Sequence, residues 1–270
     1  MNSDFIDEKR LVGDCFVASL TPRHVRPAAD VILIPGSCHG WWAWRFWAPA
    51  LAAAGYATHA LSMPNHTDAP NLSQPEYLRL TPSDYAARVV AVAGTLPGFA
   101  GRSAAGRPLV LAGHSLGGIV AQIAAKTLRP AALIPVASTG ADEVGGARIE
   151  VDPTTPMLPS PADATRMWFA DVEPDILAWA LPLLTGESPA TRNAPRGPDV
   201  LARGDITCPS LCIGAGLDGT TVPPQPDLAA WLGGDCVVFP TAGHDIMLER
   251  QAWAAVRQVI GWLDRKVPGA

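Results

Sequence analysis

Six short apolar runs alternate with helix-like segments along most of this chain, and the alternation restricts its fold more than any other feature. Such a pattern predicts successive strand–helix–strand units and a mainly parallel sheet flanked by helices, an α/β fold. The predicted strands are Val31–Ile34, Ala57–Leu61, Leu109–Ala112, Leu133–Ala137, Leu211–Gly214 and Cys236–Phe239. The predicted helices are Trp44–Ala54, Pro82–Leu96, Leu116–Leu128, Gln225–Leu232 and Glu249–Leu263. We also expect Cys15–Leu20 and His24–Val25 to pair as an antiparallel hairpin at one edge of the sheet.

The bulk composition indicates a globular protein without a nucleic-acid partner. With 270 residues, the chain lies within the range that α/β folds fill as one unit. Apolar residues make up 48% and charged residues 17%, which excludes a disordered chain. The net charge is −5 and the basic residues are scattered, so we expect neither nucleic acid nor an anionic membrane as a partner.

Three features favour a cytoplasmic protein. The first ten residues are polar and acidic, unlike a secretory signal peptide. No apolar run approaches the length that spans a bilayer. The five cysteines form an odd set without the spacing of a disulfide framework, which favours reduced thiols.

One region, 141–203, interrupts the alternation. It is rich in proline, and it also carries large apolar residues that a solvated linker would not contain, such as Met157, Trp168 and Trp179. We therefore predict a small helical cap at 141–203, inserted into a core formed by 1–140 and 204–270. A cap of this composition would place an apolar cover over a pocket.

The pentapeptide Gly113-His-Ser-Leu-Gly117 lies between a predicted strand and a predicted helix. A sharp turn there would lift the Ser115 hydroxyl clear of the sheet, and small flanking residues would leave room for it. This arrangement resembles the nucleophile elbow of the α/β-hydrolase family. The resemblance implies that Ser115 is a nucleophile and that the amide of Leu116, at the start of the helix, donates to an oxyanion.

A serine nucleophile requires a base and an acid that orients the base, and the resemblance implies the chain order serine, acid, histidine. His244 is the one histidine downstream of Ser115, and it lies between a predicted strand and the last predicted helix. Asp218 follows the strand Leu211–Gly214 and is the predicted acid. Asp142 and Glu143, which follow the preceding strand, are the alternatives for that role.

The loop after the strand Val31–Ile34 reads Pro35-Gly-Ser-Cys-His-Gly-Trp-Trp-Ala-Trp44. It resembles the His-Gly-x-x-His-Gly-x-Trp pattern of plant methylesterases, hydroxynitrile lyases and related bacterial esterases, with Pro35 in place of the first histidine. The match implies that the Ser37 amide is the second oxyanion donor. His39 matches the second histidine, either as a hydrogen-bonding brace or as a pocket residue. We expect the substrate pocket to include His39, Trp41, His114, Trp168 and Trp179.

The resemblance implies a serine hydrolase that cleaves a carboxylic ester through an acyl-enzyme, without a metal or cofactor. Dehalogenases and epoxide hydrolases of this fold need an aspartate where Ser115 stands, so Ser115 argues against both activities. Hydroxynitrile lyases with a similar loop carry threonine at the position of Gly36 and lysine at that of Asp245, so these two residues argue against lyase activity. Cleavage of C–C or amide bonds by the same triad, cofactor-free oxygenation, and largely non-catalytic binding of a small molecule remain open.

The nature of the substrate is indicated less directly. The apolar cap and the tryptophan-rich loop predict a hydrophobic, uncharged ester as the small-molecule partner. Arginines within the cap segment leave an anionic substrate open, namely Arg148, Arg166, Arg192 and Arg196. The oligomeric state is not readable from the sequence.

Overall fold

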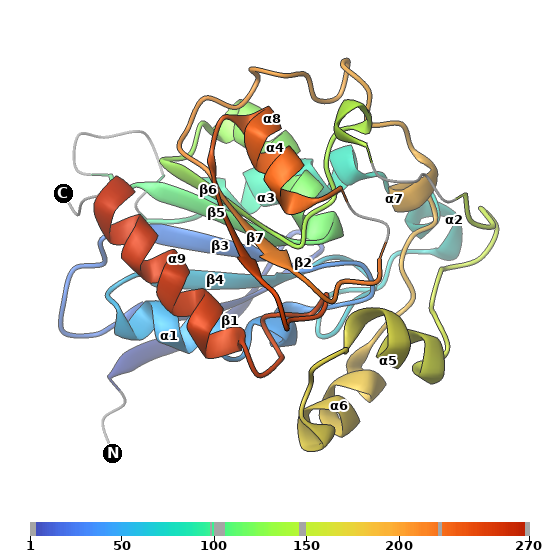
Figure 1. The fold of residues 1–270 in the computed structure, drawn as a ribbon, viewed down its shortest axis with the longest axis horizontal. Coiled ribbons are helices and arrows are strands. Elements are labelled where there is room, and N and C mark those ends of the chain that lie inside the picture. Colours follow the sequence, from blue (N-terminus) through green and yellow to red (C-terminus); the bar gives the residue numbers. More distant parts are fainter. Residues whose placement is uncertain (1–3, 98, 100–105, 146–149, 221–222, 268–270) are drawn as a thin grey trace.

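The computed structural model describes residues 4–97, 99, 106–145, 150–220 and 223–267, and its centre is a twisted sheet between two helical layers (Figure 1). The eight strands lie in the order β1-β2-β4-β3-β5-β6-β7-β8. From β4 to β8 all pairs are parallel, and β2 joins β4 in the antiparallel sense. The strands are β1 (Phe5–Val12), β2 (Cys15–Pro22), β3 (Asp30–Ile34), β4 (Ala57–Ser62), β5 (Leu109–His114), β6 (Ala132–Val136), β7 (Leu211–Ala215) and β8 (Asp235–Phe239).

The α/β prediction and its six strands are confirmed, each to within two residues at either end, but the predicted hairpin is wrong in one arm. Cys15–Leu20 does form a strand, β2, but its hairpin partner is β1 on the N-terminal side. His24–Val25 lies outside any strand and is exposed. β1 lies at the edge of the sheet and most of its side chains face solvent, so its sequence lacks the buried alternation that identifies a strand.

Helices cover both faces of the sheet (Figure 1). α1 and α9 pack on one face, whereas α3, α4 and α8 pack on the other, and each layer encloses its own apolar cluster. The predicted helix at Trp44–Ala54 is split into a 3₁₀ turn and a short helix. The elements are η1 (Trp41–Trp44), α1 (Trp47–Ala53), α2 (Gln74–Tyr77), α3 (Pro82–Gly94), α4 (Leu116–Leu128), α8 (Gln225–Leu232) and α9 (Ala252–Lys266).

Between β6 and β7 the chain leaves the sheet and forms short helices. α5 and α6 lie together to one side of the two helical layers (Figure 1). The described elements of this stretch are η2 (Asp142–Val144), α5 (Pro161–Trp168), α6 (Pro174–Ala180), η3 (Leu181–Leu183) and α7 (Ala190–Asn193). Where the chain returns, the β6–β7 ladder is sparse: Val136 pairs with Ile213, and Leu133 forms an isolated bridge to Ser210.

In the part of the chain that the structure describes, no helix combines the length and the apolar character needed to cross a membrane.

The turn from β5 into α4 passes unusually close to β3, and two glycines make this possible. A Cβ atom on Gly117 would collide with the carbonyl oxygens of Ile34 and Pro35, and one on Gly113 would collide with the carbonyl of Gly117. These neighbours are backbone atoms, which cannot move aside as a flexible side chain can. The close approach fixes the position of Ser115 between the two glycines.

We therefore expect Gly117→Ala to destabilise the fold by at least about 2 kcal/mol, because the new methyl group overpacks rigid backbone. Gly94→Ala is the control: it lies at the end of α3 with open space around its Cα, and should leave stability unchanged or raise it by up to about 1 kcal/mol. Urea unfolding of both variants measures the effect. Equal stabilities for the two would contradict the close-packing argument.

Candidate active site

Ser115 occupies a strained backbone position at the end of β5. Its φ is 51° and its ψ is −117°, a conformation that residues other than glycine rarely adopt. The surroundings hold this turn in place: the Ser115 amide donates to the Val136 carbonyl at 3.0 Å, and its own carbonyl accepts from Gly118 and Thr139. Ser115 lines a cavity at this point, so the strained turn presents its side chain to a space open to small molecules.

His244 lies in the loop between β8 and α9 and lines the same cavity. Its Nδ1 donates to Oδ2 of Asp218 at 2.7 Å, from the loop after β7. Thr220 holds the other carboxylate oxygen: its hydroxyl and its amide donate to Oδ1 of Asp218 at 2.7 and 2.8 Å. Because Nδ1 carries the proton, the lone pair of His244 is on Nε2, where it can act as a base.

The environment keeps Asp218 ionised. Burial raises the pKa of this carboxyl, but the charge and hydrogen bond of His244 and the bonds from Thr220 outweigh it, so the pKa lies below the usual 3.8. The alternative acids are held elsewhere. Asp142 accepts the Arg196 amide at 2.8 Å, and Glu143 accepts from the indole of Trp231.

Of the two predicted oxyanion residues, Leu116 follows Ser115 in the chain and Ser37 lines the same cavity. Leu116 is the first residue of α4, where amides have no acceptor within the helix. Ser37 lies in the loop after β3, is buried and lines the cavity with Ser115. Gly36 allows the loop to approach, since a Cβ there would come within 2.6 Å of His114 Nδ1.

A buried ion pair fixes the Ser37 loop to the His244 loop. His39 donates through Nδ1 to the Ser37 carbonyl at 2.7 Å and through Nε2 to Oδ2 of Asp245 at 2.8 Å. Burial lowers the pKa of His39, but the adjacent Asp245 carboxylate outweighs it and the pKa is raised above 6.5. With both ring nitrogens donating, His39 is an imidazolium paired with a fully buried carboxylate.

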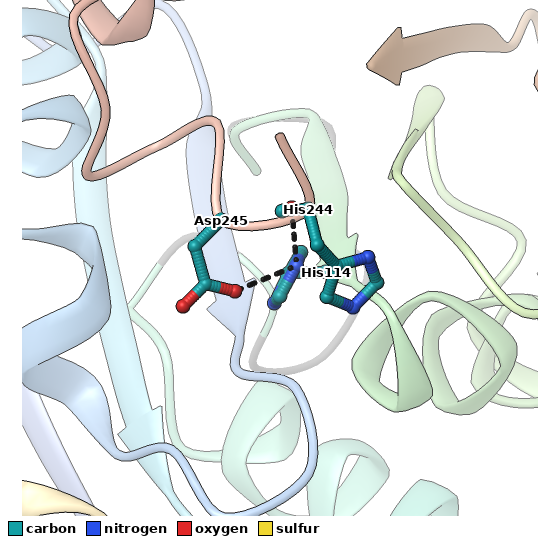
Figure 2. A group of neighbouring side chains, drawn as sticks. All are labelled: His114, His244 and Asp245. Carbon is teal, nitrogen blue, oxygen red and sulfur yellow. Dashed lines mark hydrogen bonds and ion pairs between the residues drawn. The ribbon is translucent and has the colours of Figure 1, made fainter. Parts of the chain in front are cut away.

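His114 extends this support to the backbone of His244. Its Nε2 donates to the His244 carbonyl at 3.0 Å and lies 3.4 Å from Oδ1 of Asp245 (Figure 2). Burial, reinforced by the neighbouring His244, lowers the pKa of His114 to about 3, so the ring is neutral. His114 therefore positions the loop of the candidate base without carrying charge.

His114, His244 and Asp245 lie close enough together to be considered as metal ligands. One donor atom of each residue already takes part in a hydrogen bond. The His114 Nε2 carries the proton given to a carbonyl, Asp245 Oδ2 is bonded to His39, and His244 Nδ1 is bonded to Asp218. Ligation through these three atoms would require the bonds to break, and we interpret the cluster as a hydrogen-bonded brace.

The cavity that Ser115 and His244 line has a volume of about 330 Å³. Ser37, His39 and His114 line it as well, and much of the rest is formed by the segment between β6 and β7. That segment contributes Met157, Leu158, Pro159, Met167, Trp168 and Arg192. The size suits a small organic molecule.

Comparison with known proteins identifies the fold family. The sequence profile of the Alpha/beta hydrolase family matches residues 31–258. The chain belongs to this family.

Solved structures of alpha/beta hydrolases resemble this one over most of its length. A candidate lipase from Acinetobacter baumannii is 19% identical with a TM-score of 0.75, over 98% of this chain and 92% of that one. A methylesterase from Arabidopsis is 16% identical with a TM-score of 0.63, over 88% and 98%. A thermophilic esterase from Thermogutta terrifontis is 18% identical with a TM-score of 0.67, over 97% and 99%. No curated protein matches the sequence.

Three of the five predicted pocket residues line the cavity of this hydrolase: His39, His114 and Trp168. Trp41 and Trp179 are not among its lining residues, contrary to our expectation. Trp41 turns toward the β1–β2 edge, where its indole donates to Asp68 and Lys9 lies over its ring. Trp179 packs edge-on against Trp42 and under the guanidinium of Arg45.

Seven further lining residues were not among the predicted catalytic, oxyanion or pocket residues: Met157, Leu158, Pro159, Met167, Arg192, Gly219 and Thr220. Thr220 lies in the same short turn as Asp218 and orients the carboxylate. A threonine two residues after a candidate acid is the signal that points to it, because its hydroxyl and amide can both bond back to the carboxylate.

Glu249 also holds the His244 loop in place, through hydrogen bonds from two backbone amides. Its carboxylate accepts from the Gly243 amide and, at 3.4 Å, from the Asp171 amide in the segment after α5. Burial raises the pKa of Glu249 from 4.5 to about 7, and the charges of Asp245 and Asp171 add to the effect. A proton is therefore retained in the folded state at a pH where the unfolded chain has lost it.

This shift predicts a pH-dependent stability. Because the folded pKa is raised, the contribution of Glu249 is fully present below about pH 4.5 and is lost as the pH rises toward about 7. The melting temperature of the wild type, relative to Glu249→Gln, should therefore fall between pH 5 and pH 8. Scanning calorimetry at several pH values measures this difference, and parallel curves for the two proteins would refute it.

Proposed function

We propose that this alpha/beta hydrolase is a serine carboxylic ester hydrolase with the triad Ser115, His244 and Asp218. The observation that carries the proposal is the convergence of a strained Ser115 turn and a His244–Asp218 hydrogen bond on one cavity. The esterases among the structural neighbours support the same chemistry. We further propose that 141–203 acts as a cap, since it supplies most of the apolar lining.

The proposed reaction follows from this arrangement. Nε2 of His244 takes the Ser115 proton while Oγ attacks the ester carbonyl, and Asp218 stabilises the imidazolium that forms. The amides of Ser37 and Leu116 donate to the oxyanion of the tetrahedral intermediate. The intermediate collapses as His244 returns the proton to the departing alcohol, leaving an acyl group on Ser115. Water, deprotonated by His244, then releases the carboxylic acid and regenerates the serine.

The cavity lining supports an ester with an apolar body as the substrate. Methionine, leucine, proline and tryptophan side chains surround most of the volume, and these favour an apolar substrate body. A volume of about 330 Å³ restricts the substrate to a small or medium-sized ester.

Fluorophosphonate labelling tests the nucleophile. We expect the probe to label the wild type at Ser115, and Ser115→Ala to lose both the label and hydrolysis of 4-nitrophenyl esters. Ser73→Ala is the matched control, because Ser73 is an exposed helix cap and should keep full labelling. A folded wild type that takes no label would overturn the hydrolase proposal in favour of non-catalytic binding.

The role of Asp218 gives a separate prediction. Asp218→Asn cannot hold His244 in the tautomer with its lone pair on Nε2, so kcat should fall about 10³- to 10⁴-fold. Asp142→Asn should leave kcat within about threefold, since Asp142 is bonded to Arg196. Steady-state kinetics on one ester compares the two variants. The opposite ranking would reassign the acid to Asp142.

A further inference from the structure

Arg192 is a cationic group in the wall of the Ser115 cavity. It lies on α7 and lines the cavity together with Ser115 and His244. Among the residues that the structure describes, its guanidinium makes no hydrogen bond or ion pair, and its Nε is buried without a partner. A partly buried guanidinium without an anion is costly, because some of its hydrating water has been removed and no described residue replaces it.

The carboxylates nearest to this region are already occupied. Glu187 is fully buried and accepts from Tyr85 at 2.6 Å, from the Ser188 amide at 2.8 Å and from the Cys38 amide at 3.3 Å; His66 lies 3.4 Å away. Asp245 and Asp218 are bonded to His39 and His244, respectively. Burial lowers the pKa of Arg192, and the charge of Glu187 opposes this effect without forming an ion pair.

The other arginines of this segment are engaged or lie outside the described residues. Arg166 pairs with Asp163 on the exposed face of α5, and Arg196 lies 3.5 Å from Asp142. Arg203 lies 3.8 Å from Glu143. Arg148 lies outside the described residues. The donors of Arg192 are thus uncommitted within the described structure, in a cavity where the remaining walls are mostly apolar.

We propose, building on the serine esterase function, that Arg192 binds a free carboxylate of the substrate while Ser115 attacks an ester elsewhere in the same molecule. The substrate class is then a monoester of a dicarboxylic acid, or a similar ester that carries one carboxylate on an apolar body. The guanidinium fork matches a carboxylate in a two-point hydrogen bond. The apolar lining accommodates the chain between the two groups. This proposal replaces the uncharged ester expected from the sequence with an amphiphilic ester.

A matched pair of substrates tests the proposal. Mono-4-nitrophenyl adipate and 4-nitrophenyl hexanoate have the same chain length and leaving group, but only the adipate ester carries a carboxylate. We expect kcat/KM for the adipate ester to exceed that for the hexanoate ester in the wild type. A wild-type ratio below one overturns the proposal by itself.

Variants assign the preference to Arg192. In Arg192→Met the adipate-to-hexanoate ratio should fall about 10- to 100-fold, the effect of losing a charged two-point hydrogen bond. Arg192→Lys keeps the charge without the fork and should fall in between, and it serves as the second variant if the methionine protein does not fold. Arg166→Met, which removes an exposed arginine of the same segment, should keep the wild-type ratio. An unchanged ratio in Arg192→Met refutes the proposal.

A binding measurement separates this proposal from the proposed function. Adipate should raise the melting temperature of Ser115→Ala, and adding Arg192→Met should abolish the shift. If neither ester is hydrolysed but this shift depends on Arg192, the esterase function fails and the carboxylate site stands. If both esters are hydrolysed and neither the ratio nor the shift depends on Arg192, the carboxylate site fails and the esterase function stands.

Discussion

The buried pair of His39 and Asp245 is the interaction on which the geometry of the site depends. It joins two loops that are 206 residues apart in the sequence, one with the candidate oxyanion donor Ser37 and the other with His244. Both side chains are almost inaccessible to water, so removing either one would leave an uncompensated charge in the interior. The Asp245 carboxylate also lies 3.4 Å from Nε2 of His114, which donates to the backbone carbonyl of His244.

A second buried carboxylate performs a comparable task for the segment between β6 and β7. Glu187 belongs to that segment, but its partners are Tyr85 on α3, His66 after β4 and the Cys38 amide after β3. Burial raises the pKa of Glu187, but His66 and the hydrogen bonds to Tyr85 and Ser188 outweigh it and the pKa is lowered. Glu187 thus anchors the segment to the core close to Arg192 and the cavity wall.

Features that depend on a short stretch of sequence could be predicted, whereas features that depend on contacts across the fold could not. A buried strand such as β5 is recognisable because the side chains of Leu109–Ala112 are all apolar, whereas the exposed β1 lacks such a run. Ser115, His244 and Asp218 could be named as candidates from the sequence because each follows a predicted strand. The pocket walls depend on which way a side chain turns after a short helix, as Trp41 and Trp179 illustrate, and contacts across the fold decide that direction.

The sparse ladder between β6 and β7 divides the candidate machinery into two parts. Ser115 follows β5 on one side, while Asp218 and His244 follow β7 and β8 on the other. Few backbone bonds cross this seam, and the chain between its two strands is the segment that lines the cavity. The bonds from His39 to Asp245 and from His114 to the His244 carbonyl cross from one part to the other. Where the backbone ladder is short, buried histidines therefore help to keep the candidate nucleophile and base in register.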